Sequence, residues 1–68
     1  MLSPNPNDIL AINDGAYADE NNKIKNITWY ITKAGVLYVY TDETEAEWAD
    51  YKSSIKSFGT YVYIVPSW

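Results

Sequence analysis

The stretch IKNITWYITKAGVLYVYT, residues 24–41, decides the fold of this chain. Apolar and polar residues alternate from 24 to 32, so that Ile27, Trp29 and Ile31 fall on one face. Alternation with a period of two is typical of a half-buried antiparallel strand. This part of the sequence therefore predicts a strand with one face toward a core.

A short turn and a second strand complete a hairpin. The turn is Lys33-Ala34-Gly35, in which glycine can take the left-handed conformation that short hairpin loops require. Residues 36–41 are apolar or aromatic almost throughout, as expected for a strand that pairs with the first.

Helix signals follow the hairpin. Asp42 is placed as an N-cap, and Glu45 completes the spacing of a capping box. Acidic residues gather in the first turns and lysines in the last, which suits the helix dipole. We predict a helix over 42–58 that ends at Gly59 and has an apolar stripe at helical spacing, formed by Trp48, Tyr51, Ile55 and Phe58.

The flanking segments are shorter. Residues 60–65 predict a final strand, ended by Pro66. Residues 8–12 fit a first edge strand better than one helical turn, although both stay open. Two turns are predicted, at 13–15 and at 19–23, with an extended stub between them, and residues 1–7 are expected to form an extended lead.

Together these segments predict a single α+β domain over residues 1–68. We expect a small antiparallel or mixed sheet of three or four strands in the order β(β)ββ-α-β, with one helix packed on one face. Trp29, Trp48, Ile55 and Phe58 should belong to one core.

The amino-acid composition excludes most kinds of catalytic chemistry. The 68 residues include no cysteine, histidine or arginine. Thiolate catalysis, disulfides and zinc fingers are excluded, and no imidazole is available for acid–base work. The oxygen-rich segment 13–22 does not match the spacing of an EF-hand loop, so turn chemistry explains it better than calcium. We expect no enzyme activity, no cofactor and no metal site.

The charge balance bears on partners. Nine acidic residues against five lysines give a net charge of −4, and the guanidinium fork that grips phosphate is absent. We therefore expect no nucleic-acid binding. Neither a leader peptide nor a long apolar run is evident, so the sequence predicts no membrane association and an intracellular location, either in a host cytoplasm or with a virion.

Aromatic residues on strands give the main functional hypothesis. One helix can cover only one face of the sheet, so tyrosines on the other face would form an apolar patch of the kind that marks contacts. This favours a protein-interaction or assembly module and a homodimer that pairs along residues 60–65. The candidate interaction residues are Tyr38, Tyr40, Tyr61, Tyr63 and Trp68.

Acidic residues on the helix give the alternative. Glu43, Glu47 and Asp50 point away from the apolar stripe of an ideal helix and could imitate DNA phosphates. The chain would then be an inhibitor of a host nucleic-acid-binding protein. An ordinary solvated helix face explains the same residues.

The segment EAEWADYK, residues 45–52, resembles the E-W-x-x-Y-K/R helix near the end of phage tail-fibre assembly chaperones. Small acidic chains rich in Asn and Tyr also look like accessory proteins of tailed bacteriophages. The resemblance covers eight residues and implies a role in virion assembly or host interaction, without catalysis.

Overall fold

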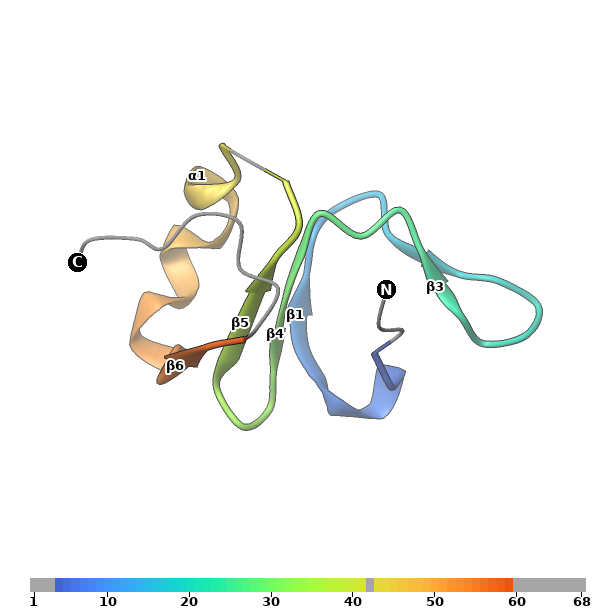
Figure 1. Ribbon diagram of the computed structural model, residues 1–68, viewed down its shortest axis with the longest axis horizontal. Helices are drawn as coiled ribbons and strands as arrows, with labels where there is room; N and C mark the ends of the chain where they lie inside the picture. The colour runs from blue at the N-terminus through green and yellow to red at the C-terminus, as the bar shows by residue number, and fades with distance from the viewer. Residues whose placement is uncertain (1–3, 42, 60–68) are drawn as a thin grey trace.

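The computed structural model describes residues 4–41 and 43–59. Its main sheet has four strands in the order β1-β4-β5-β6 (Figure 1). The pairs β1–β4 and β4–β5 are antiparallel, and β6 runs parallel to β5. The predicted small α+β fold with a mixed sheet is therefore confirmed. The strands span Ile9–Ile12 (β1), Trp29–Thr32 (β4), Val36–Val39 (β5) and Ser57–Phe58 (β6).

A second, two-stranded sheet extends from one end of the molecule (Figure 1). It pairs β2 (Tyr17–Ala18) with β3 (Ile24–Lys25) in a hairpin closed by the predicted polar turn. One turn of 3-10 helix over Pro6–Asp8 (η1) leads into β1, where extended backbone is expected. Residues 9–12 form an edge strand, as the sequence favours.

The central hairpin forms as predicted, with Tyr30 opposite Tyr38 and Gly35 at φ 87° in the turn. Its first strand is shorter than predicted. Asn26, at φ 65°, breaks the segment into β3 and β4. Asparagine tolerates this left-handed conformation better than most residues, so a local backbone preference overrides the alternating pattern.

The predicted helix over 42–58 is wrong at both ends. It begins at Glu45 after Thr44, because Glu43 takes a left-handed φ of 65°, so Glu45 does not complete the predicted capping box. An α-helical turn, α1 (Glu45–Trp48), continues as 3-10 helix, η2 (Ala49–Ser54), and the chain is extended from Ile55. The backbone after Ile55 pairs with the sheet instead of continuing the helix. The amides of Lys56 and Ser57 both donate to the carbonyl of Gly35, at 2.7 and 3.3 Å. Of the other predicted features, Asp42 and the strand over 60–65 lie outside the described residues.

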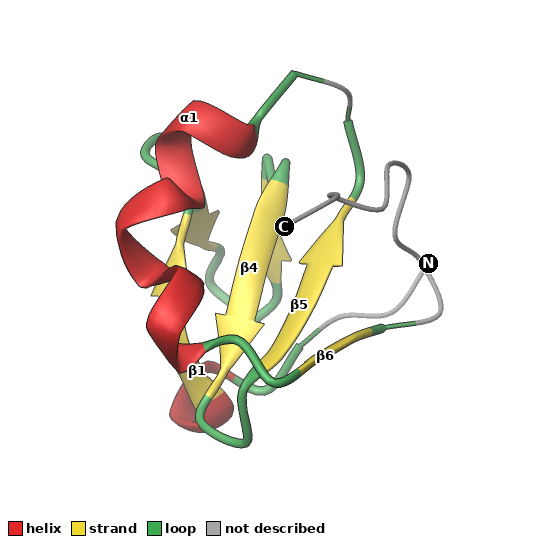
Figure 2. Cartoon of the chain, turned by 90° about the vertical axis from the view of Figure 1, so that its left-hand side faces the viewer, coloured by secondary structure: helices red, strands yellow, loops and turns green. Residues whose placement is uncertain are grey.

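The core lies between one face of the main sheet and the helical segment (Figure 2). Trp29, Ile31, Leu37, Val39 and Trp48 form it, with Ala11 and Ile55 packed against them. The predicted shared core of Trp29, Trp48 and Ile55 is confirmed. Phe58, predicted to join it, lies on β6 and is 38% exposed, because the chain has already left the helix.

Candidate functional site

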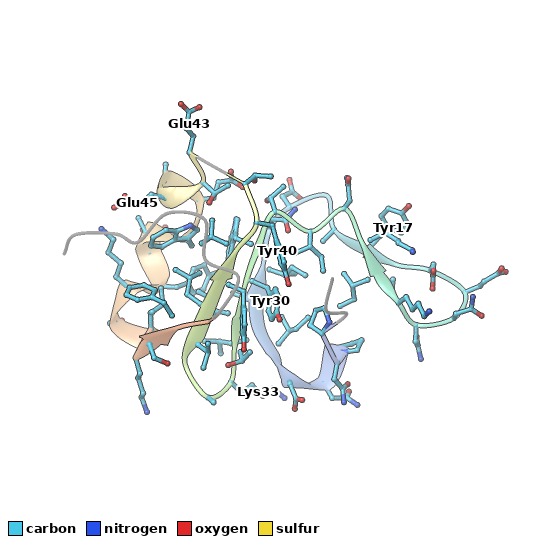
Figure 3. All side chains as sticks on the ribbon, in the orientation of Figure 1. Tyr17, Tyr30, Lys33, Tyr40, Glu43 and Glu45 are labelled. Atoms are coloured by element: carbon cyan, nitrogen blue, oxygen red, sulfur yellow. The ribbon has the colours of Figure 1, made fainter. Side chains whose placement is uncertain are left out.

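The predicted aromatic patch is largely a packed cluster. Tyr30, Tyr38 and Tyr40 lie on the sheet face opposite the helix, and the rings of Tyr30 and Tyr38 stack with centroids 4.7 Å apart. Tyr30 is buried, while Tyr38 and Tyr40 are half-buried. Figure 3 labels Tyr30 and Tyr40. A Cβ at Gly59 would overlap the Tyr38 ring, so this glycine backbone covers part of it. The other three candidates, Tyr61, Tyr63 and Trp68, lie outside the described residues.

Burial also affects the acidity of one phenol in this cluster, that of Tyr30. It raises the pKa of Tyr30 above the ordinary tyrosine value, and a hydrogen bond with Tyr40 raises the pKa further. The phenol therefore stays neutral at physiological pH. Within the described chain, Tyr38 and Tyr40 serve to complete the packing around Tyr30 more than to offer free surface.

The three acidic candidates do not form a row of free carboxylates. Glu47 accepts a hydrogen bond from the indole Nε1–H of Trp29 at 3.2 Å, so it faces the edge of the core. Glu43 precedes α1 and points away from the molecule (Figure 3), and Asp50 is exposed on η2. Nearby, Glu45 pairs with Lys52 at 2.9 Å. One of the three predicted carboxylates thus makes a structural contact, although its side chain stays exposed.

An apolar groove of about 270 Å³ lies between β1 and the β2–β3 hairpin. We call it the hairpin groove. Tyr17 lines it and is 58% exposed, and Leu10 on β1 is 49% exposed. The sequence does not predict this groove, because the strands β2 and β3 are too short to give a periodicity signal. The lining residues are Pro6, Ile9, Ile12, Ala16, Tyr17, Ala18 and Ile24.

Asn13 fixes the β2–β3 hairpin, which forms one wall of the hairpin groove, to the main sheet. Its buried side chain donates from Nδ2 to the carbonyls of Asp14 and Asn26, at 3.0 and 3.1 Å. Its Oδ1 accepts from the amides of Thr28 and Trp29, at 2.9 and 3.5 Å. One residue thus ties together both ends of the segment that carries the hairpin, and the groove is held by a fully bonded polar group.

Asp19 orders the turn of the same hairpin. Its Oδ1 accepts from the amides of Asn21 and Lys23 at 2.8 and 2.9 Å, and Lys25 lies 4.0 Å from Oδ2. The hydrogen bond from Lys23 above all lowers the pKa of this carboxyl. Among the described residues no group of three carboxylates could hold a metal ion. The hydrogen bonds of the turn account for the position of this carboxylate.

A second hollow, of about 320 Å³, lies at the end of the β4–β5 hairpin. It brings Asp8 and Lys33 to one site, next to Tyr38 (Figure 3 labels Lys33). The two side chains do not approach within 4.0 Å, and their opposite charges give the hollow no net sign. It is therefore less distinctive than the hairpin groove.

Comparison with known protein families, curated proteins and solved structures finds no significant match. The resemblance of residues 45–52 to a chaperone helix therefore stays a prediction. Within the described residues, no helix is long and apolar enough to cross a bilayer.

Proposed function

We propose that this chain is a non-enzymatic protein-interaction or assembly module that binds its partner at the hairpin groove. The observation that carries the proposal is the exposure of Tyr17 over an apolar hollow whose wall is fixed by Asn13. Aromatic anchors in preformed hollows are typical of the central part of protein interfaces.

The groove differs from the aromatic face that the sequence favours. The described tyrosines of that face already pack against each other, so little of their area is left for a partner. Tyr17, in contrast, keeps more than half of its surface exposed while its neighbours are apolar. Covering such a surface stabilises a complex by the hydrophobic effect.

Acidic mimicry is the weaker alternative. Glu47 is exposed, but its Oε1 accepts from the Trp29 indole, and a partner that drew this carboxylate away would leave a buried donor without its partner. The interaction module needs no such rearrangement. Its role in an assembly, whether of a virion or of a cellular complex, follows from the partner that the groove binds.

Site-specific photo-crosslinking tests the proposal. A photoreactive phenylalanine replaces Tyr17 in one sample and Tyr51 in the other, and each is irradiated in an extract of the organism that encodes the chain. Tyr51 is the matched control, because it is also a tyrosine and is 39% exposed at the other end of the molecule.

We expect one protein to cross-link from position 17, to be competed by excess unmodified chain, and to be absent from the sample labelled at position 51. No competed product at position 17, or equal products at both positions, would overturn the proposal.

A further inference from the structure

The turn between β1 and β2 holds the only aspartate or asparagine of the sequence that directly precedes a glycine, in the pair Asp14-Gly15. Such a pair can close a cyclic imide, in which the backbone nitrogen of the glycine attacks the side-chain carbonyl carbon of the aspartate. Glycine has no side chain to hinder this approach. A bulkier residue follows every other aspartate and asparagine of the chain.

The structure leaves both reacting groups of this pair accessible. Asp14 is exposed, and its carboxylate forms no hydrogen bond or ion pair with a described residue. Gly15 is exposed as well, with a φ of 96°, and its amide donates to no acceptor within the described ranges. Neither group therefore has to leave a partner before the two can meet.

Two similar side chains nearby are held by hydrogen bonds. The side chain of Asn13 is buried and makes four hydrogen bonds. The carboxylate of Asp19 accepts from two backbone amides. Either side chain would have to break these bonds to reach the backbone nitrogen that follows it. Sequence and structure thus select the same position, Asp14.

We propose, resting on the function proposed above, that Asp14 isomerises spontaneously to isoaspartate and that this modification loosens the hairpin groove. The Gly15 nitrogen forms a bond to Cγ of the protonated Asp14 carboxyl, and the hydroxyl leaves as water with the amide proton. Water then adds to the imide. Where it breaks the bond from nitrogen to the α-carbonyl carbon, the main chain continues through Cβ and Cγ, and an α-carboxylate is released.

The modified bond lies inside the hydrogen-bond network that holds the groove. The α-carbonyl of Asp14 accepts from Nδ2 of Asn13 at 3.0 Å, and Ala16 donates its amide to the carbonyl of Asn13 at 3.4 Å. Isoaspartate adds one methylene group to the main chain between Asn13 and Ala16. The turn must then widen, so that Ala16 and Tyr17, which line the groove, move relative to β1.

One hydrogen bond opposes the reaction in the folded chain. Closing the imide turns the Asp14 carbonyl away from Asn13 Nδ2, and the loss of one such bond slows a reaction by roughly fivefold. The folded chain should therefore isomerise only about fivefold more slowly than the chain unfolded in guanidinium chloride.

The chemistry is tested by incubating the 68-residue chain at physiological temperature, both folded and in guanidinium chloride. Cleavage after lysine releases residues 1–23, and electron-transfer fragmentation of this peptide distinguishes isoaspartate from aspartate. We expect isoaspartate at Asp14 and none at Asp8 or Asp19. Asp14→Glu is the matched control, because it keeps the charge but would have to close a larger ring, and it should form no isomer.

Two results would overturn the inference at this stage. One is a folded chain that stays unmodified while the unfolded chain isomerises. The other is isoaspartate in equal amounts at Asp8, Asp14 and Asp19.

The effect on the groove is measured on the isomerised chain after chromatographic separation. We expect its amide chemical shifts to change at Ala16, Tyr17 and Ala18, and to stay the same at Leu37 and Val39 in the core. Cross-linking from position 17 should lose most of its product. Unchanged shifts along β2 would overturn the inference.

The two proposals fail separately. If the fresh chain gives no competed product from position 17, the proposed interaction function is wrong, and the isomerisation is still judged by fragmentation and chemical shifts. If the isomerised chain cross-links as well as the fresh chain, the interaction function stands and the inference is wrong.

Discussion

Tyr38 and Gly59 show how little free space this small molecule has at the level of single residues. The Tyr38 ring stacks on the buried Tyr30 on one side and meets the Gly59 backbone on the other. Gly59 also donates its amide to the carbonyl of Leu37 at 2.8 Å, which holds it in place beside β5. The glycine is needed because of this close approach.

Gly59→Ala should therefore destabilise the fold by about 1–3 kcal/mol, the usual range for overpacking. The added methyl group forces either the Tyr38 ring or the backbone after β6 to move. Chemical denaturation followed by tryptophan fluorescence measures the free energy of unfolding. The control is Ser57→Ala, at an exposed residue of β6 two positions earlier, which should change stability by less than about 0.5 kcal/mol. Equal stability of Gly59→Ala and the parent would contradict the packing described here.

Single residues also set the limit of the sequence predictions. The core positions of Trp29 and Trp48 follow from their spacing. The hydrogen bond from Trp29 to Glu47, and three of the four bonds of Asn13, join residues 13 to 18 positions apart. No local pattern encodes such pairs, so the fixed hairpin and its groove could not be predicted.

At the level of elements, the β2–β3 hairpin depends on its turn more than on its strands. Each strand has only two residues, and pairs of this length are marginal in water. The two amide hydrogen bonds to Asp19 supply the order that the short ladder lacks.

This hairpin should loosen in acid. The pKa of Asp19 lies below its ordinary value of 3.8, so the ionised carboxylate favours the folded turn. The contribution is fully present above pH 3.8 and is lost as pH falls through the lowered pKa. Amide shifts of Asn21 and Lys23, titrated by NMR, should report this midpoint. Asp19→Asn should remove the titration, and a midpoint at or above 3.8 in the parent would contradict the prediction.

The helical segment shows why an apolar stripe alone gives a wrong boundary. Trp48 and Ile55 do face the core, as the spacing predicts, but a helix continued to residue 58 would lose the bonds that join 56 and 57 to Gly35. Two consecutive serines and the β-branched Ile55 offer weak helical preference against those bonds. Pairing with the sheet therefore prevails over local propensity.

For the molecule as a whole, one compact cluster supports a chain of only 68 residues. Trp48 is 2% exposed and is the largest side chain that the helical segment adds to this core. Its Nε1–H donates to Thr44 Oγ1 at 3.1 Å, so the indole is fixed by both packing and a hydrogen bond. Small cores rarely supply more than about 3–5 kcal/mol.

Trp48→Ala should cost about 3–5 kcal/mol and leave most of the population unfolded at room temperature. Far-UV circular dichroism and thermal denaturation measure the loss. Trp48→Phe keeps an aromatic ring in the same space, so it should retain a cooperative transition at a lower midpoint. A folded Trp48→Ala protein with an unchanged midpoint would show that the stability of the chain lies elsewhere.

The bonds of Asn13 make residues 14–27 an exchangeable cassette. Both ends of the segment meet at one side chain, so its length and composition can change while the four-stranded sheet keeps its own contacts. Lengthening a loop whose ends stay together raises the entropic cost of closing it by only about 0.6 kcal/mol for each doubling of its length. Substitutions within this cassette would then redirect the chain to new partners while the tryptophan core stays as it is, which separates the evolution of specificity from that of folding.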